Sequence, residues 1–486
     1  MISVHPPPVR MANKTLSSAP LPLAGSPFSA ADQRRSPKDI SLLAAATYAA
    51  PVTGAYFYYI PMWSILPGIY AKYFGLTLTS IAAAVLFMRV FDGIIDTTIG
   101  YVSDRHRSAG GSRKPWVVVG GLGSIVACYF LFIPPQPATT AYYLIWSLVY
   151  FLAFTIGEIP HLTWGSELTM DYQRRAHVYG VRNMMSRLGI VAFYALPLIP
   201  IYATTEYTPE ILHDAVYAGA VMTIMGLVWA IAAAPQGIAG RTTGEDSPRL
   251  FMQSLVRNKP LLLYFAAFGS GGICYGMWFG LLYFYLDSYL GLGQKVALMF
   301  LVATVVAMLA TPLWLKLIRM TSKSTAWAIG AALFIVQLVG SWFLVPGDAW
   351  WIAFALVIVA NLCFSCHDVA ALSILGDIVD YGKLKFHKDR GATYFGFNTL
   401  VFKIGLGIGG GLSLGIAGLF GFDPSQSSHS DASILGLKLG FILLPVCLAC
   451  VALAFILRTP INQRRHRIIQ RRIESRLLRS VEQPSR

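Results

Sequence analysis

The sequence predicts an all-α integral membrane protein with twelve transmembrane helices in two similar halves. First, 13% of its 486 residues are charged, against roughly 25% in soluble domains, and its mean hydropathy is +0.58. Second, its apolar residues form continuous runs of about 20 or more, which suit helices, whereas a β-barrel shows alternating polarity. Third, the second half of the chain repeats features of the first.

The runs follow an opening stretch rich in Pro, Ser and Ala. Residues 1–40 lack the apolar core of a signal peptide, and we expect a disordered cytoplasmic tail. The runs cover residues 41–70, 77–102, 115–134, 141–165, 176–203, 212–234, 261–287, 294–317, 324–345, 350–374, 391–420 and 434–457. We therefore expect helical bundles at 41–235 and 261–458, a cytoplasmic central loop at 236–260 and a basic cytoplasmic tail at 459–486.

The placement of the cations predicts the orientation of the chain. The net charge is +15, but nine of the 38 Lys and Arg residues lie between Arg458 and Arg486, and most others fill short gaps between apolar runs. These cations lie in every second loop, and therefore on one side of the membrane. The short loops on the other side contain only two cations, Lys72 and Lys295. Because positive loops stay in the cytoplasm, we expect both termini there and no nucleic-acid partner.

The cysteines and one glycine-rich segment predict packing rather than chemistry. All six cysteines lie in apolar runs, where cysteine acts as a small buried hydrophobe. Residues 405–411 (GLGIGGG) match a dinucleotide-binding pattern, but no strand precedes them, so we expect close helix packing. No nucleophile–base set occurs, and we expect neither an enzyme nor a cofactor.

One motif occurs in both halves. Residues 154–172 (FTIGEIPHLTWGSELTMDY) and 364–381 (FSCHDVAALSILGDIVDY) each place an acid four residues after Phe and a second acid nine residues after the first acid. Each stretch closes with Asp-Tyr. Two similar six-helix halves are typical of major facilitator transporters, whose substrate sites lie between the halves near mid-membrane. The sequence thus predicts a major facilitator fold.

Two carboxylates lie inside the second apolar run. Asp92 and Asp96 share a helix face with Arg89. Because an ionised acid at the bilayer centre costs roughly 2.5–3.5 kcal/mol on insertion scales, these acids need partners or a polar cavity. With Glu158 of the fourth run they suit a hard monovalent cation or a proton. The alternative is a structural network in which Arg89 neutralises one acid.

Other polar groups lie in the fifth and eleventh runs. Lys403 stands in an apolar helix with the hydrogen-bonding residues Tyr394 and Asn398. We expect it to act in substrate binding or coupling, or else to form a structural charge pair. Arg182 suits a hydroxylated or anionic solute, or else pairs with an acid near the membrane edge.

Two histidines lie near the acids of the repeated motif. His161 follows Glu158 by three residues, and His367 precedes Asp368 by one. Each histidine is either a proton carrier or a satisfied polar residue at a helix interface. The sequence defines no role for Asp368.

Four stretches resemble the glycoside–pentoside–hexuronide:cation symporters, the melibiose-permease-like branch of the major facilitators. Residues 89–116 (RVFDGIIDTTIGYVSDRHRSAGGSRKPW) resemble helix II and the following loop of that family. Residues 158–189, 376–386 (GDIVDYGKLKF) and 392–405 (ATYFGFNTLVFKIG) agree in order and spacing. The resemblance runs from about residue 42 to 458.

The resemblance implies a role for each matching residue. Asp92 and Asp96 match the acids that bind the coupling cation, and are metal ligands if that cation is Na⁺. Glu158 matches an acid near both sites. Arg182 matches an arginine that lines the sugar cavity, and Lys403 matches a lysine near cation and sugar.

The resemblance also implies a gate and shows three departures. A G-x-x-x-D-R motif at the end of the second run, common in facilitators, implies gating; here it consists of Gly100, Asp104 and Arg105. The departures are Tyr56 in place of a sugar-gripping acid, Leu162 in place of a tryptophan and Thr97 in place of a proline. Tyr56 is therefore expected at the substrate.

We expect a secondary active transporter that couples a glycoside, pentoside, hexuronide or related sugar to Na⁺ or H⁺ by alternating access. One charge crossing 100 mV supplies about 2.3 kcal/mol, more than the ~1.4 kcal/mol of a tenfold gradient. One alternative is the same fold moving a non-sugar amphiphile or an organic anion; another is a membrane sensor without transport. We expect a monomer in the lipid bilayer of a bacterial inner membrane.

Overall fold

The computed structural model describes residues 41–169, 172–237, 257–386, 391–426, 428–458 and 468. Every regular element in these ranges is helical. The expectations for residues 1–40, for most of the central loop and for the C-terminal tail beyond 458 concern residues outside the described ranges, apart from residue 468.

The helices follow one another with short connections. The first half contains α2 (Leu42–Ser64), α3 (Leu66–Phe74), α4 (Leu78–Ser108), α5 (Lys114–Phe132), α6 (Thr140–Glu167), α7 (Tyr172–Ala195), η1 (Leu196–Leu198) and α8 (Pro209–Ala233). The second half contains α10 (Lys259–Phe284), η2 (Tyr285–Tyr289), α11 (Gly293–Met320), α12 (Lys323–Trp342), α13 (Trp350–Phe386), α14 (Gly391–Leu419), α15 (Asp431–Lys438), η3 (Leu439–Leu443) and α16 (Leu444–Arg458).

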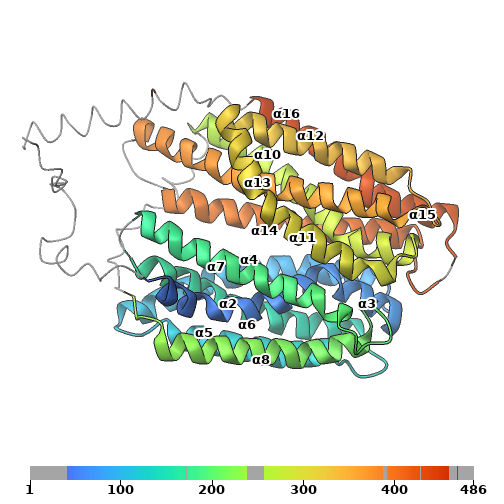
Figure 1. Cartoon of the computed structure of the whole chain (residues 1–486), viewed down its shortest axis with the longest axis horizontal. Helices are drawn as coiled ribbons and strands as arrows, with labels where there is room; N and C mark the ends of the chain where they lie inside the picture. Colours follow the sequence, from blue (N-terminus) through green and yellow to red (C-terminus); the bar gives the residue numbers. More distant parts are fainter. Residues whose placement is uncertain are drawn as a thin grey trace, which may run out of the picture.

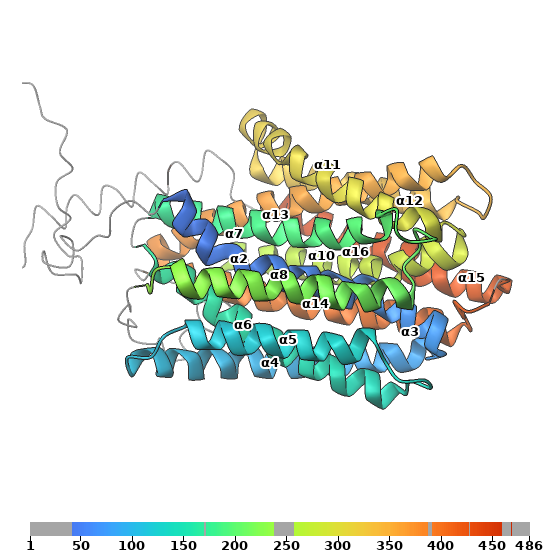
Figure 2. The same ribbon diagram turned by 60° about the horizontal axis from the view of Figure 1, so that its bottom comes forward.

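Ten helical segments among the described residues are long and apolar enough to cross a membrane. The helices α2 and α7 are not among these ten, although both run alongside the others (Figures 1 and 2). The composition explains this, because α2 contains four tyrosines and two prolines and α7 contains four arginines. The protein is a multi-pass membrane protein.

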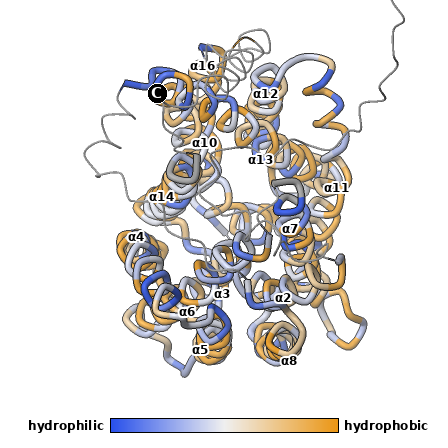
Figure 3. The backbone as a smooth tube through the Cα atoms, turned by 90° about the vertical axis from the view of Figure 1, so that its left-hand side faces the viewer, coloured by the Kyte–Doolittle hydropathy of each residue, from blue (hydrophilic) through white to orange (hydrophobic). Residues whose placement is uncertain are grey.

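The surface of the bundle suits a bilayer. Figure 3 looks along the helices, and hydrophobic residues cover much of the periphery. Several large apolar side chains on different helices are more than half exposed, among them Val119, Val126, Val228, Leu309 and Leu313. In a membrane these side chains contact lipid, so their exposure carries no penalty.

The helices of residues 42–233 lie together in the lower part of Figure 1, and those of residues 259–458 lie together in the upper part. One end of the bundle, which we name the basic end, holds the C-terminal ends of α4, α6, α11 and α13. The opposite end, which we name the far end, holds α3 and α15 (Figure 2). The helix ends that border the predicted cation-rich loops therefore lie at one end; which compartment that end faces stays a prediction.

The two halves meet along the far end. Lys72 Nζ lies 2.9 Å from Asp287 Oδ2, and Thr205 Oγ1 donates to the carbonyl of Gln294 at 2.6 Å. Between the halves α4 packs on four glycines of α14: Arg89, Leu86, Ala82 and Thr79 lie against Gly407, Gly411, Gly415 and Gly418, respectively. Nearer the basic end, a Cβ at Gly396 would have no neighbour within 4 Å. The glycine-rich segment of α14 thus serves close helix packing.

Candidate functional site

The acids of α4 lie between α6 and α14. Arg89 Nη1 lies 3.1 Å from Asp92 Oδ2, and both side chains are more than nine-tenths buried. Thr155 Oγ1 of α6 donates to Asp96 Oδ1 at 2.9 Å. The spacing of three and four residues places these three α4 side chains on one face, as the sequence predicts.

Lys403 reaches the same acids from the other half. Its Nζ lies 2.5 Å from Asp96 Oδ2 and 3.9 Å from Asp92 Oδ2. A lysine inside an apolar helix needs an acidic partner, and here the partner is on α4. The pair is compatible with either alternative for Lys403, a structural charge pair or a role in coupling.

A second cluster adjoins the first along α6. Glu158 Oε1 lies 2.5 Å from Arg182 Nη2, and Tyr56 Oη of α2 donates to the same oxygen at 3.3 Å. Charge-assisted bonds of this length are the strong ones in proteins. Three residues that the sequence assigns to cation or solute therefore meet here, although their roles stay predictions.

The bonds of His161 define its protonation. Its Nδ1 accepts from Arg182 Nε at 3.3 Å, so that nitrogen carries no proton. Its Nε2 lies 2.8 Å from the carbonyl of Tyr48, to which it donates, and the two rings stack at 4.3 Å. This neutral, fully bonded ring favours the satisfied interface residue over the proton carrier.

The corresponding residues of the second half differ. His367 Nδ1 accepts from Trp327 Nε1 at 3.1 Å, and its ring stacks on Phe268 at 4.9 Å. Asp368 instead pairs across the halves, with Oδ2 3.4 Å from Arg187 Nη2. The side chains of Asp368 and Arg187 are 40% and 37% exposed, respectively, so this pair is the more accessible one. Asp368 and Arg187 therefore form a further ion pair between the two halves.

Tyr394 and Asn398 both contact residues of their own half. Asn398 is buried, and its Oδ1 accepts from Tyr264 Oη of α10 at 2.9 Å. Tyr394 is 1% exposed and packs beside Gly382 of α13. Both residues lie against helices of their own half in this conformation, and their role in binding solute stays a prediction.

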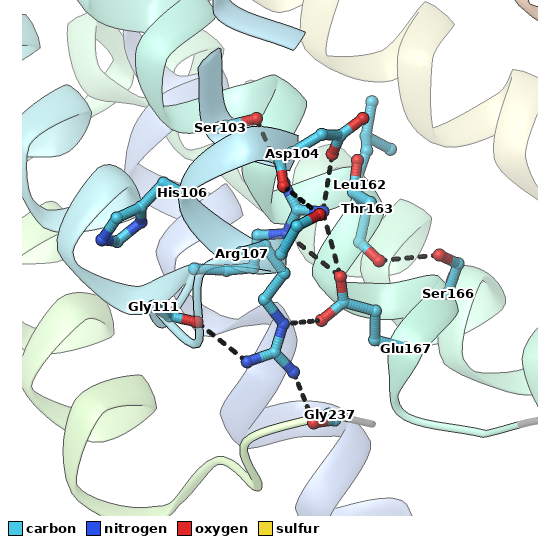
Figure 4. A network of polar contacts seen from close by, with 12 residues as sticks. Ser103, Asp104, His106, Arg107, Gly111, Leu162, Thr163, Ser166, Glu167 and Gly237 are labelled. Atoms are coloured by element: carbon cyan, nitrogen blue, oxygen red, sulfur yellow. Dashed lines mark hydrogen bonds and ion pairs between the residues drawn. The ribbon is translucent and has the colours of Figure 1, made fainter. Parts of the chain in front are cut away.

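The gating residues lie at the basic end. Asp104 Oδ1 is 2.7 Å from Arg113 Nη2, so this acid pairs within its own half (Figure 4). Arg105 is exposed, and a Cβ on Gly100 would lie 3.9 Å from Ile159. These positions do not test whether the three residues act as a gate, so the gating role stays a prediction.

The centre of the network at the basic end is a residue that the sequence reasoning did not assign. Glu167 accepts from Arg107 Nε at 2.9 Å and from Arg113 Nε at 3.1 Å (Figure 4). Arg107 also donates to the carbonyls of Gly111 and Gly237. Glu167 is the second acid of the repeated motif, and this repeated position is the sequence feature that could have identified it.

The motif that occurs in both halves of the sequence makes corresponding ion pairs in both halves of the structure. The second acid of each half bonds a cation at the start of the preceding helix: Glu167 bonds Arg113 before α5, and Asp377 bonds Lys323 of α12 at 2.6 Å. The first acids, Glu158 and Asp368, both bond arginines of α7. The sequence repeat therefore marks two equivalent ion pairs at the basic end and two acids that converge on one helix.

Known proteins are similar to this chain over most of its length. A family model described as MFS/sugar transport protein matches residues 42–463. The uncharacterized symporter YnaJ of Bacillus subtilis (strain 168) is 22% identical over 90% of this chain and 96% of its own length. The raffinose carrier protein of Pediococcus pentosaceus is 21% identical over 76% of this chain and 60% of its own length. Among solved structures, the nucleoside transporter NupG superposes with a TM-score of 0.63 at 10% identity, over 87% of this chain and all of that chain, which shows the major facilitator fold.

Proposed function

The chain belongs to the MFS/sugar transport protein family, and from that premise we propose that it couples the uptake of a sugar or sugar-like solute to Na⁺ or H⁺ by alternating access. Related proteins are named as symporters and carriers, so transport rather than catalysis is its activity. The single observation that carries the coupling is the ion pair between Lys403 and the α4 acids.

This ion pair makes the coupling cation and the lysine competitors. The ammonium of Lys403 contacts both acids, and so occupies the place where oxygen ligands would hold Na⁺. A cation or proton on Asp92 or Asp96 weakens the attraction that ties α14 to α4. Loading of the ion therefore favours parting of the halves at the far end, and its release favours the conformation described here.

The solute binds beside this ion site. Tyr56, Glu158 and Arg182 present a hydroxyl, a carboxylate and a guanidinium within one bonded group. The accessible pair Arg187–Asp368 lies between α7 and α13. Hydroxyl-rich solutes match such a mixture of donors and acceptors, which supports a sugar over an apolar compound.

The arrangement in the membrane completes the proposal. Twelve crossing helices form two six-helix halves, with α2 and α7 added to the ten apolar segments, and both termini lie in the cytoplasm of a bacterial cell. Two observations support this count. Arg182 of α7 is buried on Glu158 rather than exposed to lipid, and α2 buries thirteen of its 23 residues.

Uptake into liposomes tests the proposal. The reconstituted protein is offered labelled glycosides, pentosides and hexuronides under an inward Na⁺ gradient, an inward H⁺ gradient or neither, beside Asp92→Asn. We expect uptake that needs one gradient and fails in the variant. Uptake that ignores both gradients and the substitution would refute coupling through the α4 acids.

A further inference from the structure

Arg89 is buried with half of its guanidinium unused. The side chain is 6% exposed, its guanidinium carbon lies 3.3 Å from the ring centre of Trp63, and Nη1 bonds Asp92. Among the residues that the structure describes, no acceptor lies within hydrogen-bond distance of Nε or Nη2. Buried donors without partners are costly, so these two N–H groups call for an acceptor that the chain itself does not supply.

The two unused donors form one recognition edge. Nε–H and the adjacent Nη2–H of an arginine point in the same direction and match the two oxygens of a carboxylate. Asp92 takes the other nitrogen, Nη1, and so leaves this edge open. A single hydroxyl of a neutral sugar would use one of the two donors.

The helix α14 covers this edge in the present conformation. A Cβ added to Gly407 would collide with Cγ, Cδ and Nε of Arg89. Arg89 lies about two turns from Asp96 on the side of the far end, within the stretch where α4 and α14 touch. Parting of these helices at the far end would uncover the edge to a solute that enters there.

The charges of the site point to an anion as well. Asp92, Asp96 and Glu158 pair with three cations, which are Arg89, Arg182 and Lys403. One bound coupling cation adds a positive charge that has no partner within this group. A solute with one carboxylate restores neutrality, which matters because unpaired charge is expensive inside a membrane.

We propose that Nε and Nη2 of Arg89 bind the carboxylate of the transported solute, which is a hydroxylated carboxylic acid such as a sugar acid. The inference rests on the proposed function and assigns its substrate class. Trp63 supports the guanidinium from behind, and Gly407 is the cover that α14 places over the edge when the far end closes.

Binding to the purified full-length protein in nanodiscs tests this assignment. Calorimetry in Na⁺ compares D-glucuronate and D-galacturonate with D-glucuronamide, D-glucose and glycolate. We expect at least one sugar acid to bind at least about tenfold more tightly than the amide and the neutral sugar. Glycolate tests whether a simple hydroxylated carboxylate is enough. If glycolate binds as tightly as the sugar acids, the need for the sugar ring is refuted. No preference for acid over amide, or no binding by any compound, overturns the proposal.

A matched pair of variants identifies the residue. Arg89→Lys keeps the charge but removes the paired donors, and we expect it to reduce the ratio of acid to amide affinity to about threefold or less. A purely structural role would weaken acid and amide equally and leave that ratio unchanged, which refutes the assignment. Arg319→Lys, the same change at an exposed position of α11, should keep the wild-type ratio. If Arg89→Lys does not fold, the wild-type preference still decides the substrate class.

Gradient dependence is measured separately, by uptake of the preferred compound. Acid selectivity with uptake that ignores both gradients would refute coupling and keep the carboxylate site. Coupled uptake of a neutral sugar at the rate of its acid would keep the proposed function and refute the carboxylate site.

Discussion

Lys403 and Asp96 lie 307 residues apart in the sequence and 2.5 Å apart in space. Their ion pair joins α14 to α4, and Thr155 of α6 donates to the second oxygen of the same carboxylate. A group that would bind the coupling ion is therefore also a group that holds the halves together. This shared use gives ion binding a direct effect on the conformation.

Removal of the competing lysine should strengthen cation binding and abolish coupling. In Lys403→Gln the α4 acids lose their ammonium partner, so we expect a lower cation concentration for half-saturation and loss of concentrative uptake. Calorimetric Na⁺ titration and liposome uptake measure the two effects. Lys403→Arg, which keeps the charge, should behave closer to the wild type; a weaker cation affinity in Lys403→Gln would contradict the competition.

The Glu158–Arg182 pair should matter more for stability than the Arg187–Asp368 pair. Glu158→Gln leaves Arg182 buried without its partner, at a cost of about 3–5 kcal/mol. Asp368→Asn removes a pair that is more than a third exposed, and exposed pairs contribute about 0–1 kcal/mol. Thermal melting of both variants in the same detergent provides the comparison, and equal losses would refute this ranking.

Gly407→Ala should open the far end. The added Cβ collides with the side chain of Arg89, so α14 can no longer close on α4. Spin labels at Ile201 and Phe343, both 74% exposed in far-end loops of different halves, report the opening as a longer distance in a cysteine-free protein. Gly396→Ala on the same helix, where a Cβ meets nothing within 4 Å, should leave the distance unchanged.

Above neutral pH, the contribution of Lys72 to closure of the far end should be lost only in the strongly alkaline range. Burial lowers the pKa of Lys72, but the carboxylates of Asp287 and Glu206 outweigh it and raise that pKa above its ordinary value. A raised lysine pKa means that its contribution is complete below about pH 10.4 and is lost at higher pH. The same spin labels should report one distance from neutral pH to about pH 10 and a longer one once the pH exceeds about 10.4. Asp287→Asn should give the longer distance already at neutral pH.

Glu167 should protect the loop between α4 and α5. It accepts from Arg107 and Arg113, and Arg107 bonds the carbonyl of Gly111 in this loop. We expect trypsin to cleave Glu167→Gln in the loop faster than the wild type, since both arginines lose the carboxylate that they share. Asp104→Asn removes an acid that is 51% exposed and should have a smaller effect. Equal cleavage of the two variants would contradict a central role for Glu167.

The sequence predicted the helical class and the family because both depend on local properties. Each apolar run enters the membrane by its own hydropathy, and Asp92 shares a helix face with Arg89 by spacing alone. Ten of the expected spans correspond to apolar helices in the described residues. The helices α2 and α7 fall short on simple hydropathy because their tyrosines and arginines lower its mean. Tyr48, Tyr58 and Arg182 are nevertheless buried, which composition does not reveal.

The sequence did not predict which groups meet. It named Glu158 and Arg182 separately, and it missed that Arg107 and Arg113 converge on Glu167. It placed Asn398 on one helix with Lys403, as the structure shows, but it did not predict the bond of Asn398 to Tyr264 of α10. Hydrophobicity alone does not specify these partners.

The amino-acid sequence by itself determined that this chain crosses a membrane many times, which acids lie in its helices and which family it joins. The tertiary structure alone decided that Lys403 reaches Asp96 and that Gly407 covers the open edge of Arg89. The physical reason is that insertion depends on the composition of each segment, whereas the register between helices depends on how small residues let two distant segments approach.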